Sequence, residues 1–181
     1  MSVLKVDTIN EKTSGNGVVI ADMTSPGHII QTVIGSTFGT ENSTASSSFV
    51  RLGSSLEGTI TPKFSSSKIE VTLTIANLMF WQNVQDTRIQ FGITRDNGSS
   101  FVREYNNRFY DYGGSGAQFH YTPTLVAIDS PGSTSALTYK LYAKIVSSSG
   151  NIRINDDQGS GTSSGTAGAC FSQFILREIA Q

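Results

Sequence analysis

The chain has 181 residues, a length that suits one domain with a short extension, and its formal net charge is −1. Only 15% of the residues are charged, against roughly 25% in a typical soluble domain, and this balance gives no electrostatic case for binding nucleic acid. The single cysteine, Cys170, excludes an intrachain disulfide, and no apolar run approaches the roughly 20 residues of a membrane-spanning helix.

The first predicted element is a short strand-like stretch that is too small to bury its own apolar residues. Turn residues follow it at 11–17, and a second apolar run lies at Val18–Ile20. An isolated hairpin of this size is only marginally stable in water. We therefore expect residues 1–27 to be stabilised by other copies of the chain or by a partner protein. The apolar residues of the first stretch are Val3, Leu4, Val6 and Ile9.

From residue 28 onward the sequence predicts β-strands nearly throughout. Ile69–Ala76 alternates apolar and polar residues, which is typical of a half-buried strand, and Asn97-Gly98 predicts a type I′ turn. The apolar residues of Ser135–Val146 from Leu137 to Ile145 share one face. The predicted strands are His28–Ile34, Ser48–Leu52, Glu57–Pro62, Ile69–Ala76, Arg88–Arg95, Ser100–Tyr105, Thr122–Asp129, Ser135–Val146, Asn151–Asn155 and Ser172–Ala180.

About ten short strands with turn residues between them, and no amphipathic helix, predict an all-β antiparallel sandwich or jelly roll. Three segments lack strand periodicity and carry polar or aromatic side chains, so we expect them to be loops: Asn77–Asp86, Asn106–Gly116 and Asp156–Gly168.

Motifs for catalysis or metal binding are not visible in the sequence. There is no nucleophile elbow, phosphate-binding loop or paired-cysteine motif, and His28 and His120 lie far apart. Asp156-Asp157 could belong to a calcium-binding turn, but the segment lacks the repeated carboxylate spacing of an EF-hand. A plain charged turn is therefore favoured. The sequence therefore predicts no cofactor, no metal site and no enzymatic activity.

The segment Tyr105–Tyr121 is unusual because six aromatic rings lie among Asn, Asp, Arg and Gly. Rings beside amide and carboxylate groups suit contacts with carbohydrate or protein surfaces. In the alternative interpretation, half of these rings fill the core or a subunit interface. The candidate receptor-binding residues are Arg108, Phe109, Tyr110, Asp111 and Tyr112.

Five stretches resemble one family of proteins and occur in that family's order. Ser2–Val18 (SVLKVDTINEKTSGNGV) closely resembles the leader of tail-fibre-like structural proteins of bacteriophages, especially those of marine and cyanobacterial hosts. The other similar stretches are Pro26–Val33 (PGHIIQTV), Gly58–Val71 (GTITPKFSSSKIEV), Asp129–Lys144 (DSPGSTSALTYKLYAK) and Ser172–Ala180 (SQFILREIA).

This resemblance implies a homotrimeric fibre whose head is a jelly-roll or tumour-necrosis-factor-like sandwich. Residues 1–27 would anchor the trimer to the phage tail or to an adaptor protein, and residues 28–181 would form the head. The head would contact a host surface polysaccharide or an outer-membrane receptor. The protein would assemble in the host cytoplasm and reside in the tail of the virion. A capsid decoration or a tail adaptor with a purely structural role is the alternative.

Overall fold

The computed structural model of the chain describes residues 26–82, 86–110, 117–147, 150–155 and 170–181. These residues form thirteen β-strands and no helix, which confirms the all-β prediction. The described residues thus include no helix long and apolar enough to span a membrane. The strands are β1 (Ile29–Ile34), β2 (Asn42–Thr44), β3 (Val50–Arg51), β4 (Glu57–Ile60), β5 (Lys68–Thr74), β6 (Leu78–Gln82), β7 (Asp86–Thr94), β8 (Arg103–Tyr110), β9 (Ala117–Tyr121), β10 (Thr124–Asp129), β11 (Leu137–Ser147), β12 (Gly150–Ile154) and β13 (Gln173–Ile179).

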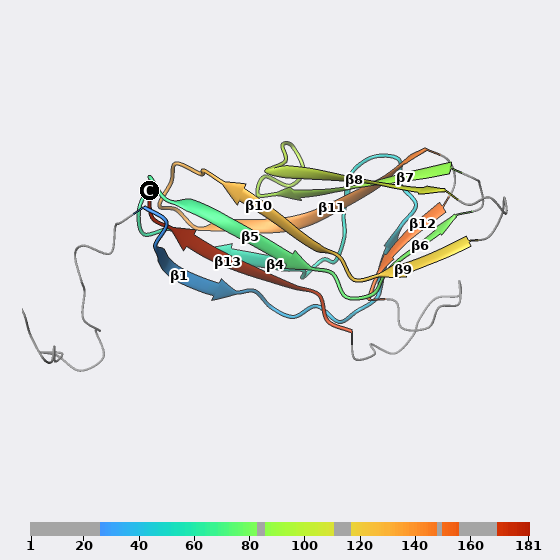
Figure 1. Cartoon of the computed structure of the whole chain (residues 1–181), viewed down its shortest axis with the longest axis horizontal. Helices are drawn as coiled ribbons and strands as arrows, with labels where there is room; N and C mark the ends of the chain where they lie inside the picture. Colours follow the sequence, from blue (N-terminus) through green and yellow to red (C-terminus); the bar gives the residue numbers. More distant parts are fainter. Residues whose placement is uncertain (1–25, 83–85, 111–116, 148–149, 156–169) are drawn as a thin grey trace, which may run out of the picture.

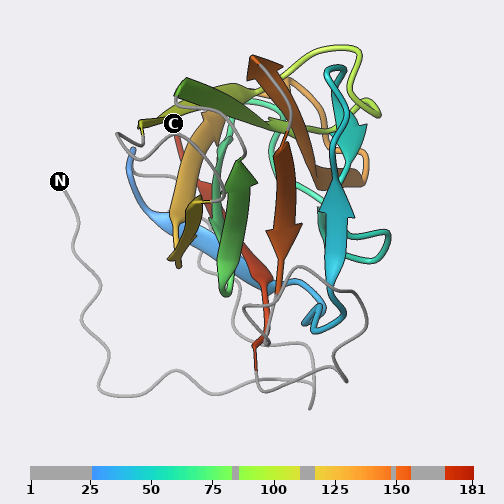
Figure 2. The same cartoon turned by 90° about the vertical axis from the view of Figure 1, so that its right-hand side faces the viewer.

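The strands pair antiparallel in three sheets that together make a sandwich (Figure 1). The long sheet has the order β1-β13-β5-β10, and the facing sheet has the order β3-β11-β7-β8, with β4 also paired to β11. The end sheet, β2-β12-β6-β9, continues the long sheet past a bend, because residues 75–77 join β5 to β6 and residues 122–123 join β9 to β10. Figure 2 views the sandwich from the side of the end sheet.

The core lies between the long sheet and the facing sheet. On β5, Ile69, Val71 and Leu73 are fully buried and alternate with half-buried residues, as the period of two predicts. The predicted shared face of β11 is confirmed, since its apolar residues point into the same cluster. Burying one such side chain contributes roughly 1.5–3 kcal/mol. On β11 these residues are Tyr139, Leu141, Ala143 and Ile145, with Leu137 partly buried at the start.

The outer face of the long sheet leaves β-branched side chains in solvent, with Ile34 65% and Ile128 50% exposed. The register aligns its side chains in rows across the strands. One row is Ile34, Ile175, Thr72 and Val126, and the next is Thr32, Arg177, Glu70 and Ile128. Arg177 and Glu70 form an ion pair on this surface, and Lys68 lies opposite Ile179 in the row after it. We call its apolar residues the apolar face: Ile29, Ile34, Val126, Ile128, Ile175 and Ile179.

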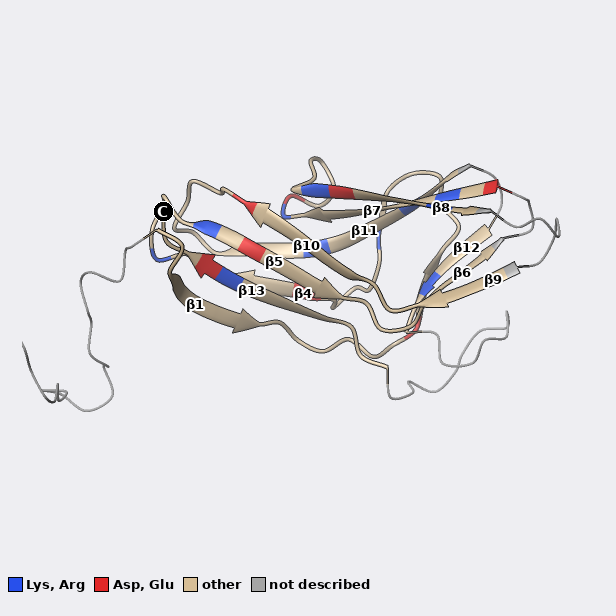
Figure 3. Ribbon diagram, viewed as in Figure 1, with Lys and Arg blue, Asp and Glu red and all other residues tan. Residues whose placement is uncertain are grey.

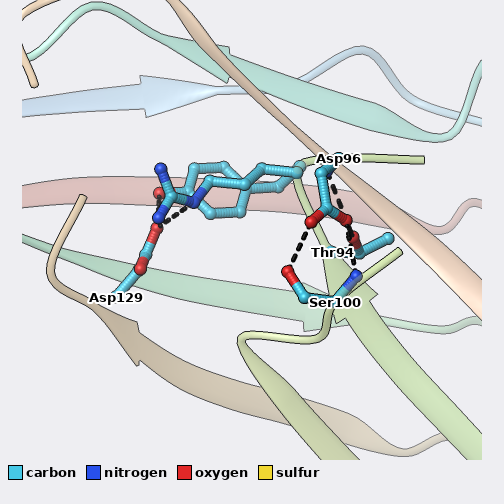
Figure 4. Close-up of polar contacts among 6 residues, drawn as sticks. Thr94, Asp96, Ser100 and Asp129 are labelled. Carbon is cyan, nitrogen blue, oxygen red and sulfur yellow. Dashed lines mark hydrogen bonds and ion pairs between the residues drawn. The ribbon is translucent and has the colours of Figure 1, made fainter. Parts of the chain in front are cut away.

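The hairpin between β7 and β8 is built around the Asp96 carboxylate (Figure 4). Asn97 and Gly98 have φ of 60° and 88°, which confirms the predicted positive φ at both positions. The predicted strand start at Ser100 is wrong, because the Ser100 N–H donates to Asp96 Oδ1 at 3.0 Å and holds this residue in the turn. Hydrogen bonds from Ser100 and Thr94 hold the pKa of the Asp96 carboxyl well below its usual value. The connection is therefore longer than a two-residue turn.

At the same end, a buried polar contact joins the long sheet to the facing sheet. The Tyr139 hydroxyl on β11 donates to Asp129 Oδ2 on β10 at 2.8 Å, and Arg95 lies 3.1 Å from the same oxygen (Figure 4). Burial and the Asp129 carboxylate raise the pKa of Tyr139 above its usual value, so its hydroxyl stays a donor.

Two predicted loops are in part strands. The segment Asn77–Asp86 contains β6, in which Leu78–Phe80 are buried in succession, so the strand is covered on both faces and shows no alternation. In the segment Asn106–Gly116, residues 106–110 belong to β8, where pairing with β7 overrides the poor strand propensity of asparagine. Residues 111–116 and the third segment, Asp156–Gly168, lie outside the described residues.

The other predicted strands are present, with changes at their ends. β3 is shorter than Ser48–Leu52, and β4 ends before Pro62. Two strands that were not predicted, β2 and β9, border the end sheet.

A buried hydrogen-bonded junction holds the bend between the long sheet and the end sheet. Asn155 Nδ2 donates to the carbonyl oxygens of Phe38 and Thr40 at 2.8 and 3.1 Å, and its Oδ1 accepts from Ser172 Oγ at 2.7 Å. The Ala76 N–H donates to the same Ser172 oxygen at 2.9 Å, and the Asn155 N–H donates to the Ala76 carbonyl at 2.9 Å. Every polar group of the Asn155 side chain is thus satisfied, as burial requires.

A buried carboxylate fixes the link between β4 and β5. Glu178 on β13 is fully buried, and its carboxylate accepts from the N–H groups of Lys63 and Phe64 at 2.8 and 3.1 Å and from Gln31 Nε2 at 2.6 Å. Burial alone would raise the pKa of Glu178, but these donors outweigh it and lower the pKa below its usual value. The carboxylate therefore stabilises the fold while it is ionised.

Because the folded pKa of Glu178 is depressed, its contribution is present above the unfolded pKa of about 4.3 and is lost as the pH falls through the folded pKa. We expect Glu178→Gln to lower the free energy of unfolding by about 1–3 kcal/mol at pH 7 and by much less at pH 3. Urea denaturation at the two pH values measures this. Glu70→Gln, in a more exposed ion pair, is the control, and an equal loss at both pH values would contradict the assignment.

Candidate functional site

The sequence-predicted receptor residues lie on or after the second half of β8, the outermost strand of the facing sheet. Arg108 and Phe109 are described in full, and the main chain of Tyr110 ends the strand opposite Asp86. Two of the predicted receptor residues and the whole predicted anchor lie outside the described residues. These are Asp111 and Tyr112, and Val3, Leu4, Val6 and Ile9.

Arg108 points outward from β8 and is 58% exposed. Its Nε and Nη2 atoms donate to the two carboxylate oxygens of Asp86, both at 2.8 Å, in a bidentate pair. The hydrogen bond and charge of Arg108 lower the pKa of the Asp86 carboxyl. Arg88 lies directly opposite Arg108 in the ladder, so two guanidinium groups and one carboxylate share this exposed corner. Such groups recognise ligands through oriented hydrogen bonds.

Phe109 points the other way, into the sandwich. Its ring stacks on Phe80 with the centroids 5.0 Å apart, and it contacts Phe119 at 5.0 Å and Tyr121 at 5.9 Å. The interpretation in which rings of this segment fill the core therefore describes Phe109, Phe119 and Tyr121. The alternation of β8 separates Phe109 from Arg108, which sequence reasoning had grouped together.

A small groove of about 240 Å³ lies along β8 where it meets β9. Asn107 Nδ2 donates to the Tyr121 hydroxyl at 2.8 Å across this seam. Burial raises the pKa of Tyr121 to about 12, although the hydrogen bond from Asn107 opposes the shift, so the hydroxyl stays protonated near neutral pH. Amide, phenol and guanidinium groups here suit a ligand rich in hydroxyl groups.

Sequence reasoning did not single out Asn106 and Asn107 as candidate site residues. Their position on an edge strand beside β9 depends on the sandwich closing, which no local pattern reveals. Across the described residues, no group of three or more His, Cys, Asp or Glu side chains could hold a metal ion.

Comparisons with known proteins give little support for any identification. No family model matches the chain, and no curated protein matches it. The chain is similar to a solved structure titled "Structure of infectious bursal disease virus Gx strain", with a TM-score of 0.32 and 12% identity, over 96% of this chain and 42% of that one. The chain thus spans less than half of that protein's length, and a likeness at this TM-score carries no argument about function.

The two described receptor candidates are expected to respond differently to truncation. Phe109→Ala should lower the free energy of unfolding by about 2–4 kcal/mol, because it removes a ring from the aromatic cluster. Arg108→Ala removes an exposed pair and should leave the denaturation midpoint nearly unchanged. Urea denaturation of both variants measures this. Equal destabilisation would show that Arg108 has a structural role that its exposed pair does not explain.

Proposed function

We propose that this chain is a tail fibre protein of a bacteriophage virion. Residues 1–27 attach it to the phage tail or to an adaptor protein, and the head, residues 28–181, contacts a surface glycan or an outer-membrane receptor of the host. The sequence resemblance of the leader and of four head segments supports this function. A capsid decoration or tail adaptor with the same fold is the second candidate.

The observation that carries the proposal is the orientation of the head: the described chain enters at one end, and the candidate receptor residues lie at the other. The described chain enters the sandwich at β1, whose first residue, Ile29, pairs with Ile179 at the end far from the bend (Figure 1). Arg108 and Tyr110 lie at the other end, since Tyr110 pairs with Asp86 just after β6. A head held through its N-terminal side would present this end of β8 outward.

The strand order supports a jelly roll or tumour-necrosis-factor-like head. If β1 and β2 count as one bent strand, and likewise β3 with β4, β5 with β6, β9 with β10 and β12 with β13, eight strands result. Their order is then 1-8-3-6 in the bent sheet and 2-7-4-5 in the facing sheet. Two four-stranded antiparallel sheets connected in this way are the arrangement of a jelly roll.

The apolar face supports assembly into a homotrimer. Ile29, Ile34, Val126 and Ile128 are each 46–65% exposed on one side of one sheet. Figure 3 shows few charged positions along most strands. The charged residues on this face are Arg177 and Glu70, which form an ion pair, and Lys68 opposite Ile179. Exposed apolar side chains gathered on one face of a sheet mark a site of protein contact.

Receptor contact is assigned to the β8 end of the head. The contact groups are Arg108, Tyr110, Asp111 and Tyr112, with Phe109 supporting them from the core. One sugar-sized contact is weak, so three equivalent sites on a trimer, and several trimers on one particle, provide firm attachment through avidity.

The function is tested by locating the protein on intact particles. A labelled antibody against the head should bind the tail, and a chain without residues 1–25 should fold but be absent from purified virions. This deletion keeps the hydrogen bond of 2.9 Å from the Gly27 N–H to the Ala180 carbonyl, so β1 stays in the sheet. Label on the capsid would favour the decoration protein, and normal incorporation of the truncated chain would exclude the anchor.

The trimer interface is tested separately by charge substitution. Ile34→Asp combined with Ile128→Asp should reduce the mass measured by light scattering from that of a trimer to that of a monomer, since it buries charge in the apolar contact. Val146→Asp, at an exposed valine of the facing sheet, is the matched control and should remain trimeric. If the double variant keeps the trimer mass, subunits do not meet through this face.

A further inference from the structure

A second and larger groove lies on the outer side of the bend between the long sheet and the end sheet. Its volume is about 610 Å³, within the range of roughly 300–1,000 Å³ for small-molecule sites. No Asp, Glu, Lys or Arg is among the described residues that line it. The lining groups that matter are Thr74, Asn77, His120, Thr122 and Phe171.

The buried junction brings these distant residues together. Asn77 follows Ala76, and Phe171 precedes Ser172, and the Ala76 N–H donates to Ser172 Oγ at 2.9 Å. Phe38 and Ser172 also exchange two main-chain hydrogen bonds of 2.9 Å, so the chain beside Phe171 is held on both sides. The groove is thus built on a fixed floor rather than on an isolated surface loop.

Phe171 supplies a positioned aromatic surface in this groove. Its side chain is 55% exposed, although its backbone neighbour Ser172 is fully buried. The ring packs against Gly39, where an added Cβ would lie 2.6 Å from a ring carbon. The glycine therefore lets the ring lie against the backbone while part of it stays open to solvent. An exposed ring that is held in place offers contact area at low entropic cost.

Hydrogen-bonding groups lie on the other side of the groove. His120 on β9 is exposed, and its Nδ1 lies 3.3 Å from Asn77 Oδ1. Asn77 has a φ of 39°, a strained conformation for a residue with a side chain, which places its amide at the bend. The hydroxyl groups of Thr74 and Thr122 add donors and acceptors that carry no charge.

We propose that this groove binds one neutral hexose ring of a host-surface glycan. The apolar face of the sugar lies on Phe171, and its hydroxyl groups exchange hydrogen bonds with Asn77 and His120. Because no Lys or Arg is among the described residues of the lining, a neutral sugar is favoured over an acidic sugar or a phosphate group, which would need such a partner. The inference rests on the proposed function, because it names a ligand class and a second contact site for the same head.

The experiment is saturation-transfer NMR and calorimetric titration of the full-length protein with D-glucose, D-galactose, D-mannose and N-acetyl-D-glucosamine. At least one should bind with a Kd on the order of millimolar, and D-glucuronic acid should bind more weakly. Phe171→Ala should weaken binding about tenfold. Phe64→Ala, at a 45% exposed phenylalanine outside the groove, should bind as the unchanged protein does.

A second variant tests the groove in case Phe171→Ala fails to fold. Asn77→Gly keeps a residue that tolerates positive φ and removes the amide, so it should fold and bind more weakly. Failure of all four sugars to bind, or unchanged binding by both groove variants, overturns the site. If the protein is found on the tail but binds none of the sugars, only this inference is overturned and the proposed function stands. If the protein binds a sugar but is absent from the tail, the groove remains a sugar-binding site and the proposed function is overturned.

Discussion

The fold of this chain depends on the buried contact between Asn155 and Ser172. Four separate segments meet there. Asn155 Nδ2 donates to the carbonyl oxygens of Phe38 and Thr40, and its Oδ1 accepts from Ser172 Oγ. Ser172 Oγ in turn accepts from the Ala76 N–H. Left without these partners, each buried polar group would cost about 1–3 kcal/mol. The junction therefore specifies one geometry for the bend, and the bend aligns the end sheet with the long sheet. Both grooves include residues of β9 or its flank, so their shapes depend on this alignment.

The sequence predicted the parts of the fold in which one face of a strand is buried and the other faces solvent. Ile69–Leu73 and Tyr139–Ile145 follow a period of two because each strand has one core side, and Asn97-Gly98 was found from its need for positive φ. Periodicity gave no signal at Leu78–Phe80, because burial on both sides of the strand removes the period of two. It also failed at residues 106–110, where polar side chains line an edge strand that tertiary pairing holds in place.

The candidate sites were harder to predict than the strands. The aromatic and polar composition of β8 drew attention to Arg108 and Phe109, but only the register shows that these side chains leave the strand on opposite faces. The larger groove gave no local signal, since Asn77, His120 and Phe171 come from distant parts of the chain and meet only when the bend forms. Sequence patterns report neighbours along a strand, whereas this groove depends on neighbours across three strands.

The outer surface of the long sheet changes character along its length, which would let the proposed assembly and the proposed ligand binding coexist. Its first rows contain the isoleucines and valine of the apolar face together with Lys68, Glu70 and Arg177, and the row next to the bend contains Gln173, Thr74 and Thr124. The Thr74 and Thr124 hydroxyl oxygens lie 3.5 Å apart in that polar row, and Thr74 also lines the larger groove. A contact between subunits that follows the apolar side chains would end before this row. The larger groove would then stay open on each subunit of the proposed assembly. It lies at the bend, away from the end of the head at which the chain enters β1.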